Sequence, residues 1–160
     1  MNVFPRADSE GTGGITDWSE TERSTMDDYR PFQKQMTREV KAACKGALDG
    51  GASGILLQDA HDAARNIDVT ALPEEVRILR GWTGDLLSMM SGLDTDDFGA
   101  VLFTGYHACA ACPGNPLSHT MNLRNEYVLL NGVLASEFLI NTYTAGYYGV
   151  PVSFLSGDEA

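Results

Sequence analysis

A long amphipathic helix between two short strands is the feature that most constrains the fold of this chain. Residues 31–49 carry apolar side chains at spacings of three and four, Met36 and Val40 among them, which predicts one buried helical face. Residues 2–7 and 54–58 on either side are predicted to be strands. Parallel strands need a crossover of about this length, so the order predicts an α/β fold with a mostly parallel sheet flanked by helices.

The rest of the chain continues this alternation. Asn131-Gly132 lies between two apolar runs in residues 126–136, a pattern typical of a β-hairpin, and residues 136–148 should form the last helix. Residues 16–30 are polar and should form a surface loop. Further strands are predicted over residues 75–79, 100–104 and 150–155, a short helix is predicted over residues 85–91, and the tyrosines of the last helix (Tyr143, Tyr147 and Tyr148) are expected in the core.

Length and charge narrow the class of protein. The chain has 160 residues, which suits a single domain with a real core. Its net charge is −11, with 22 acidic and 11 basic residues, which argues against nucleic acids and anionic membranes as partners. No apolar stretch approaches the roughly 20 residues of a membrane span, and the N-terminus lacks the apolar core of a signal peptide. We therefore expect a cytoplasmic protein.

Three predicted strands are each followed by side chains that could bind a metal. Asp8 and Glu10 follow the first strand, His61 follows the second, and His107 follows strand 100–104. Ligands of open α/β sheets bind beyond the carboxyl ends of the strands, where these side chains should meet.

Two carboxylates and two imidazoles form a ligand set suited to zinc or manganese. A bridging carboxylate among them could hold two ions roughly 3.5–4 Å apart, the usual spacing of dinuclear hydrolase sites. Each residue alone has a simpler explanation, because loop carboxylates are usually solvated and single histidines are usually structural. Only the conjunction predicts a metal site.

The three cysteines, Cys44, Cys109 and Cys112, leave other possibilities open. An odd number favours a reduced compartment over a disulfide framework. Cys109-Ala-Ala-Cys112 could be a redox couple or, with His107, three ligands of a structural zinc. We expect two ordinary loop thiols, because no second cysteine pair exists and the strand–Cys-x-x-Cys–helix context of redox folds is missing.

Read together, several short motifs resemble the zinc-dependent D-aminopeptidase family. The resemblance runs in order through nearly all 160 residues. Its motifs are Asp8-Ser-Glu-Gly11, Gln58-Asp-Ala-His61, Gly105-Tyr-His-Ala108, Ser118-His-Thr-Met121 and Ala135-Ser-Glu137, followed by Ala145-Gly-Tyr-Tyr-Gly-Val-Pro-Val152 and Ser156-Gly-Asp158.

The resemblance implies a role for each site residue. Asp8 would bridge two zinc ions, Glu10 and His107 would complete one site, and His61 and Glu137 would complete the other. His119 would be the nucleophile or catalytic base. Glu137 and His119 come from the resemblance alone, since the sequence by itself shows only a carboxylate at a helix N-terminus and a loop histidine.

The implied activity is release of an N-terminal D-amino acid, typically D-alanine, from short peptides, by a ring-like homo-oligomer. Pro5-Arg6 departs from the apolar first strand of the family, so either that strand is distorted or the segment is unusual in this chain. Family chains also continue well beyond a motif such as Gly157-Asp158, so residues 1–160 would be a single N-terminal, metal-binding domain. The alternatives are a dinuclear amidase acting on another small amide, a non-catalytic metal-binding or interaction domain and, more distantly, a redox module based on Cys109 and Cys112.

Overall fold

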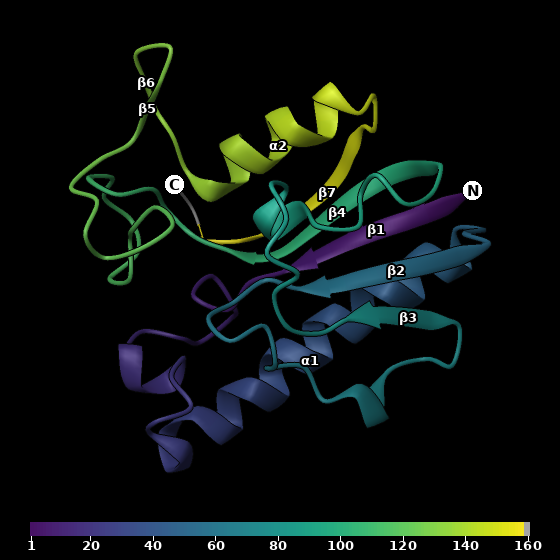
Figure 1. The fold of residues 1–160 in the computed structure, drawn as a ribbon. Helices are drawn as coiled ribbons and strands as arrows, with labels where there is room; N and C mark the ends of the chain where they lie inside the picture. Colours follow the sequence, from purple (N-terminus) through teal and green to yellow (C-terminus); the bar gives the residue numbers. More distant parts are fainter. Residues whose placement is uncertain (159–160) are drawn as a thin grey trace.

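Five parallel strands form one sheet in the computed structural model, which describes residues 1–158 (Figure 1). The strand order is β3-β2-β1-β4-β7, so the N-terminal strand lies at the centre. The predicted parallel sheet, its flanking helices and the hairpin are confirmed. The elements are β1 (Asn2–Ala7), α1 (Met26–Asp49), β2 (Gly54–Asp59), β3 (Val76–Leu79), β4 (Phe98–Tyr106), β5 (Leu129–Leu130), β6 (Val133–Leu134), α2 (Glu137–Tyr147) and β7 (Val152–Gly157), with 3-10 helices at Trp18–Glu20, Val69–Ala71 and Ser88–Met90.

Proline 5 is accommodated inside the central strand. Pairing of β1 with β4 runs without a break from Val3 to Ala7, whereas the pairing with β2 is recorded on either side of Phe4 and Pro5 but not at them. Proline has no N–H to donate, so a local gap in one ladder is its expected consequence. The strand still delivers its last residues to the sheet edge.

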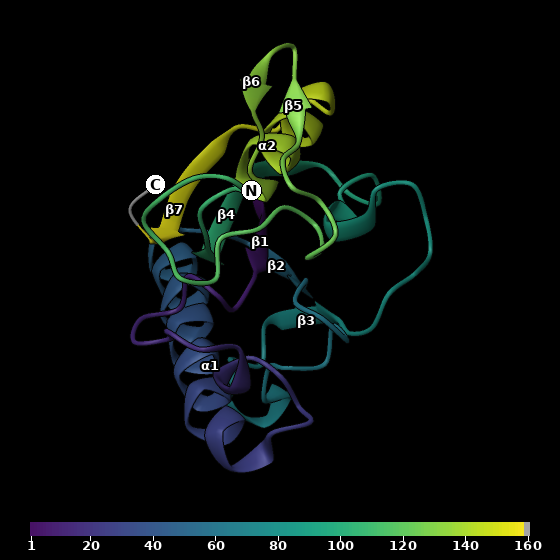
Figure 2. The same cartoon turned by 90° about the vertical axis from the view of Figure 1, so that its left-hand side faces the viewer.

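Helix α1 covers one face of the sheet (Figures 1 and 2). Met36, Val40 and Cys44 follow one another at a spacing of four and pack against Ala7 of β1 and Ile55 of β2. Burial of such side chains contributes roughly 1.5–3 kcal/mol each, relative to leaving them exposed. This face of the sheet is therefore an apolar core.

The helix begins earlier than the sequence suggested. It starts at Met26, within the expected loop of residues 16–30, and Pro31 is its sixth residue rather than part of its first turn. The polar residues before Pro31 hide this start from a reading of apolar periodicity, although Asp27 and Asp28 suit a helix N-terminus. Tyr29 is buried in this first stretch.

The second face of the sheet is covered by α2 and the turn at residues 88–90. Phe4, Phe103 and Tyr106 of the strands pack there against Met90 and Ala145. The predicted helix over residues 85–91 is wrong: only residues 88–90 form a 3-10 turn, because Ser88 has a positive φ of 52° that ends a regular helix.

The tyrosines of α2 also differ from expectation. Tyr143, Tyr147 and Tyr148 are exposed rather than buried, because the helix packs on the sheet through Phe138, Asn141 and Ala145 instead. Neither α1 nor α2 combines the length and the low charge that a membrane span requires, and no other helix of residues 1–158 does so.

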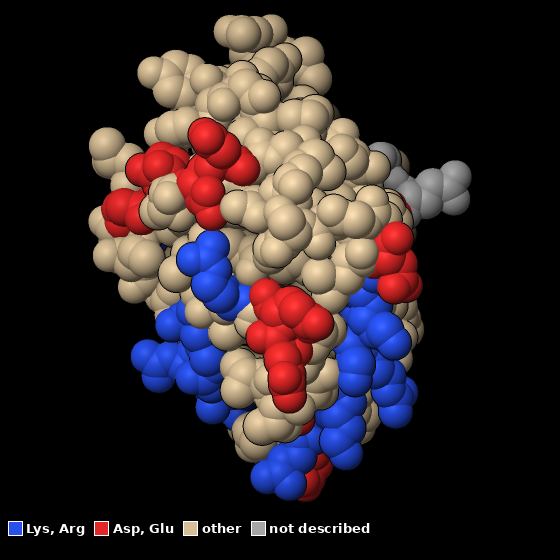
Figure 3. Space-filling view, turned by 90° about the vertical axis from the view of Figure 1, so that its right-hand side faces the viewer, with Lys and Arg blue, Asp and Glu red and all other residues tan. Residues whose placement is uncertain are grey.

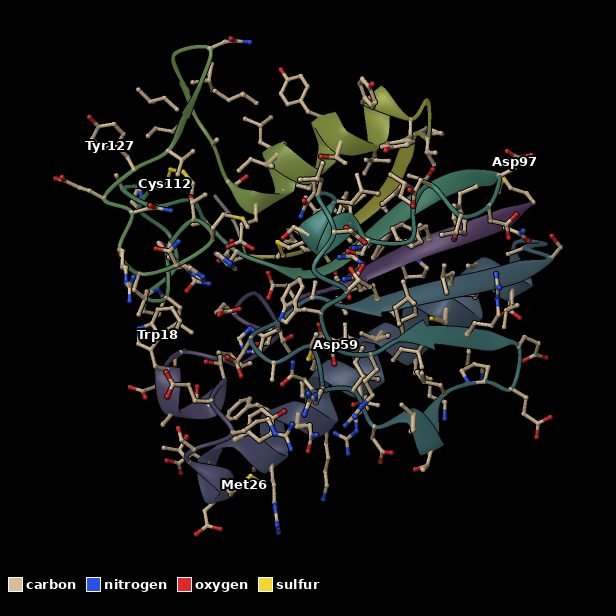
Figure 4. The ribbon with its side chains drawn as sticks, viewed as in Figure 1. Trp18, Met26, Asp59, Asp97, Cys112 and Tyr127 are labelled. Carbon is tan, nitrogen blue, oxygen red and sulfur yellow. A yellow bond between two sulfur atoms is a disulfide. The ribbon has the colours of Figure 1, made fainter. Side chains whose placement is uncertain are left out.

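All five strands point their carboxyl ends toward the same edge of the sheet (Figure 1). The loops that leave this edge include residues 8–17, residues 60–68 and the long connection from β4 to α2. Trp18 and Cys112 lie on this side of the molecule, and Asp97 lies on the opposite side (Figure 4). The strands therefore deliver Asp8, His61 and His107 to one place.

Candidate metal centre

The first group of site residues joins the end of β1 to the end of β2. His61 Nδ1 lies 3.4 Å from Asp8 Oδ1 and 3.1 Å from Glu10 Oε2. On the other side of the ring, His61 Nε2 lies 3.0 Å from the carbonyl oxygen of Thr21. A carbonyl can only accept, so Nε2 carries the proton and Nδ1 is left to face the carboxylates.

The second group joins the end of β4 to the loop before α2 and to the start of that helix. Glu137 Oε1 lies 3.6 Å from both His107 Nε2 and His119 Nε2. The two imidazole rings stack with their centroids 4.2 Å apart. Each ring turns its Nδ1 to a backbone carbonyl, that of Ala108 or Leu117, so both Nε2 atoms point toward Glu137.

Glu137 reaches the cluster because another residue caps its helix. Ser136 is the N-cap of α2, and its hydroxyl accepts from the backbone N–H of Leu139. The carboxylate of Glu137 is thereby free, and its Oε1 accepts from the N–H of Met121 at 2.7 Å. Ser136, and not Glu137, therefore caps the N-terminus of α2.

Asp8 lies between the two groups. Its Oδ1 faces His61, and its Oδ2 lies 3.7 Å from His107 Nε2. Glu10 lies beside His61, and Glu137 lies beside His107. Asp8 alone touches both groups.

Two glycines allow this packing. A Cβ atom added to Gly11 would lie 1.9 Å from the carbonyl oxygen of Tyr106, and one added to Gly105 would lie 2.1 Å from that of Asp8. Gly105 also has a φ of +70°, which suits glycine. The backbones after β1 and β4 therefore touch directly, and this brings Asp8 close to His107.

The cluster is buried and its charges are coupled. Asp8, Glu10 and Glu137 are each less than 5% exposed. Burial, together with the neighbouring Glu10, raises the pKa of Asp8 to about 8. Burial would also raise the pKa of Glu10, but the adjacent His61 lowers it below its usual range. Despite its own burial, His61 has a pKa well above the usual value because Glu10 and Asp8 surround it.

These residues fit divalent cations. Asp8 Oδ2 and His107 Nε2 face each other without a hydrogen-bond partner, although both atoms are buried. Buried polar atoms are nearly always paired, so two orphans at one point indicate a missing partner. Two groups of three ligand atoms, each within 4.8 Å of one another, supply the carboxylate and imidazole donors that zinc prefers: Asp8, Glu10 and His61 in one, and His107, His119 and Glu137 in the other.

Arg6 is a buried neighbour of Asp8 whose burial the sequence did not reveal. It precedes Asp8 by two residues on β1, so both side chains lie on the same face of the sheet. It is fully buried, and it donates to Gln58 Oε1. Burial lowers its pKa to about 10, which leaves it charged at neutral pH.

Asp59, which precedes His61, is not a ligand. Its Oδ1 accepts from the side-chain amide of Asn66, and its Oδ2 accepts from the N–H of Ile67 at 2.9 Å. Asn66 Nδ2 also donates to the carbonyl of His61. The carboxylate thus shapes the loop that carries His61 (Figure 4).

The cysteines of the β4–α2 loop form a disulfide between Cys109 and Cys112, so the expectation of two free thiols is wrong. Cys44 is a free and buried cysteine of α1. The disulfide leaves neither Cys109 nor Cys112 as a thiolate ligand for a zinc with His107.

A cavity of about 800 Å³ opens above the ligands. Trp18 and Trp82 are among its lining residues, and Trp18 meets the edge of the His119 ring with centroids 5.4 Å apart. His119 lines the cavity, as do Asp8, Glu10, His61 and Glu137. The ligand cluster is therefore accessible to a small molecule.

Comparison with known proteins agrees with this geometry. A family model described as D-aminopeptidase matches residues 1–160. The D-aminopeptidase of Bacillus subtilis (strain 168) is 34% identical over 161 residues, which cover 99% of this chain and 57% of that protein. The solved structure titled Zn-dependent D-aminopeptidase DppA from Bacillus subtilis, a self-compartmentalizing protease, matches with a TM-score of 0.86 and 32% identity, over 95% of this chain and 54% of that one.

The chain thus spans a little over half the length of both relatives. The family model matches residues 1–160, which include all six site residues of this chain, and this match supports assignment of the chain to the family. This chain belongs to the D-aminopeptidase family.

Proposed function

We propose that this chain carries the two-zinc active site of an aminopeptidase that releases N-terminal D-amino acids, of the D-alanine type, from short peptides. The observation that carries the proposal is the position of Asp8, whose two oxygens face two separate ligand groups. The D-aminopeptidase name of the relative and the zinc dependence named for the solved structure support it.

Five residues would hold the metals. Asp8 would be shared by the two zincs, Glu10 and His107 would complete one site, and His61 and Glu137 would complete the other. When bound, such a pair of ions polarises the scissile carbonyl and lowers the pKa of a nearby water. Asn66 and the carbonyl of Thr21 hold the His61 loop in place for this role.

His119 would be the catalytic base. Its Nδ1 is fixed by the carbonyl of Leu117, its Nε2 points into the cluster, and its ring lines the cavity. Nε2 can accept a proton from the attacking water and return it to the leaving amine, which completes hydrolysis of the peptide bond. The same nitrogen is also placed to attack the carbonyl carbon itself.

The purified protein is expected to bind two zincs per chain and to cleave D-Ala-D-Ala much faster than L-Ala-L-Ala. A chelator should inactivate it. Equal cleavage of both peptides would remove the stereospecific part of the proposal. Hydrolysis of other small amides in place of D-peptides would favour an amidase, and two bound zincs without any hydrolysis would favour a non-catalytic metal-binding domain.

We also propose that copies of this chain assemble into a ring-like homo-oligomer. The solved relative is described as self-compartmentalizing, which requires several subunits. Apolar side chains stand exposed on the β5–β6 hairpin, where Leu129 and Val133 are more than half exposed, and on α2, where Tyr147 is 86% exposed. The surface over α2 carries few charged side chains (Figure 3). Such patches mark interaction surfaces.

Val133→Glu should therefore reduce the molar mass measured by light scattering while two zincs remain bound. An unchanged mass would exclude the hairpin from the interface. The cytoplasmic location expected from the sequence stays a prediction, which fractionation of the source cells would test.

A further inference from the structure

The cavity above the metal ligands is lined by side chains of mostly one charge. Arg23 is the only lysine or arginine that lines it within residues 1–158. It stands among acidic residues, of which Asp8, Glu10 and Glu137 are proposed zinc ligands, whereas Glu22 and Asp62 would repel a carboxylate that enters the cavity.

Arg23 belongs to a segment that is tied to the metal site. Thr21 is buried, and its carbonyl oxygen contacts His61 Nε2 at 3.0 Å. The hydroxyl of Thr25, on the far side of Arg23, donates to the carbonyl oxygens of Ser19 and Glu22. The backbone at Arg23 is thus fixed between two anchors, one of which touches a proposed zinc ligand.

The guanidinium of Arg23 has no ion-pair partner. The one ion pair of a lysine or arginine side chain described within residues 1–158 joins Arg77 to Asp96. Arg23 is exposed at the rim of the cavity, and Glu22 beside it accepts instead from the hydroxyl of Ser24. An unpaired guanidinium at the rim can therefore receive a carboxylate from a ligand.

A short peptide offers two charged ends of opposite sign. Its amino group and scissile carbonyl would occupy the proposed metal site, so its C-terminal carboxylate needs a cation elsewhere in the cavity. We propose that Arg23 binds the C-terminal carboxylate of the peptide substrate and thereby makes the site selective for short peptides with a free carboxyl terminus. This inference rests on the proposed aminopeptidase function and extends it to substrate choice.

Arg23 lies close to the metal site along the chain. It follows Thr21, whose carbonyl contacts His61, by two residues, which span at most about 7 Å. A dipeptide also extends about 7 Å from end to end, so Arg23 lies at the length scale of a short peptide whose amine occupies the metal site.

Binding at this position should affect KM more than kcat. The carboxylate is not itself changed in the reaction, so Arg23 would hold it equally in the substrate and in the transition state. One charge-assisted contact at a partly exposed rim corresponds to a factor of roughly ten in affinity.

The test compares D-Ala-D-Ala with its C-terminal amide, using the zinc-loaded protein and the variants Arg23→Met, Arg23→Lys and Arg38→Met. Arg23→Met should raise KM for the free acid roughly tenfold, leave kcat within about twofold, and leave the amide unaffected. Arg23→Lys should restore part of the loss. Arg38→Met, which removes the same charge from an exposed position of α1 outside the cavity, should change nothing.

Calorimetry on a His119→Ala background separates binding from turnover. The inference is supported if the acid binds more tightly than the amide and if Arg23→Met loses this difference. It is supported even if the unmodified protein hydrolyses neither peptide, because that result would contradict only the proposed function. Equal binding of acid and amide, binding of neither, or the same loss for both in Arg23→Met would overturn the inference.

Discussion

The two faces of β1 differ in what covers them and in what they do. On one face, Val3 and Ala7 pack beneath α1 in an apolar core. On the other face, Phe4 joins the core beneath α2, but Arg6 and Asp8 turn that surface polar toward the sheet edge. Side chains alternate along a strand, so consecutive residues serve opposite functions.

This contrast teaches that stability and chemistry are separated across a single strand. The clusters on the α1 face consist of apolar side chains and the buried thiol of Cys44. The opposite face buries a guanidinium and carboxylates, which cost free energy unless other charges offset them. Substitutions on the two faces should therefore have different signatures.

Asp8→Ala, on the polar face of β1, is the substitution with the largest expected effect. Loss of the proposed bridging carboxylate should release both zincs and abolish hydrolysis, while the apolar core of the α1 face stays intact. Elemental analysis after dialysis measures the zinc content, and circular dichroism reports the fold. Asp8→Asn, which keeps the size of the side chain beside the buried Arg6, guards against loss of folding. Two zincs retained in either folded variant would contradict the bridging role.

His119→Ala should separate metal binding from turnover on the polar side. We expect both zincs to remain and kcat to fall by about 10²- to 10⁴-fold, the usual contribution of a general base. Steady-state kinetics and metal analysis on the same sample measure the two effects. A kcat close to that of the unmodified protein would rule out His119 as base or nucleophile.

Met36→Ala examines the opposite face. The side chain is 2% exposed and packs in the α1 core, so its truncation should lower the free energy of unfolding by about 2–5 kcal/mol. Urea denaturation measures the loss, and the zinc content of the folded variant should stay at two per chain. If zinc were lost from a variant that is still folded, the separation of the two faces would be wrong.

The pH dependence of zinc binding is the smallest expected effect. The pKa of Asp8 is raised to about 8, so in the metal-free protein this carboxyl holds a proton below that pH, which zinc must displace. The raised pKa of His61 adds a second proton that zinc must displace, so apparent zinc affinity should fall as the pH is lowered through 8. Calorimetry in buffers of different ionisation enthalpy counts the released protons.

The raised pKa of Asp8 also predicts that the stability of the metal-free protein depends on pH. Because the folded-state pKa of Asp8 lies above its unfolded value, the metal-free fold gains stability at low pH and loses it as the pH rises toward 8. The raised pKa of His61 acts in the same direction. Thermal melts should show Tm of the metal-free protein falling between pH 6 and 8. A Tm that rises over this range would show that other groups dominate.

The sequence by itself predicted most of the strands, both α-helices and the three strand ends that carry Asp8, His61 and His107. Apolar periodicity predicts α1, and Asn131-Gly132 predicts the hairpin turn, because both depend on neighbours in the chain. Strand polarity then brings Asp8, His61 and His107 to one edge, since parallel strands end on the same side. Local patterns were sufficient for these features.

Only the tertiary structure decided how the site is completed. Glu137 and His119 come from a helix start and a loop, and no local pattern shows that both face His107. The pairing of Glu10 with His61, the burial of Arg6 and the tie between Thr21 and His61 likewise depend on contacts across 40 residues or more. Such contacts follow from packing of the whole sheet, which is why residue order alone could not supply them.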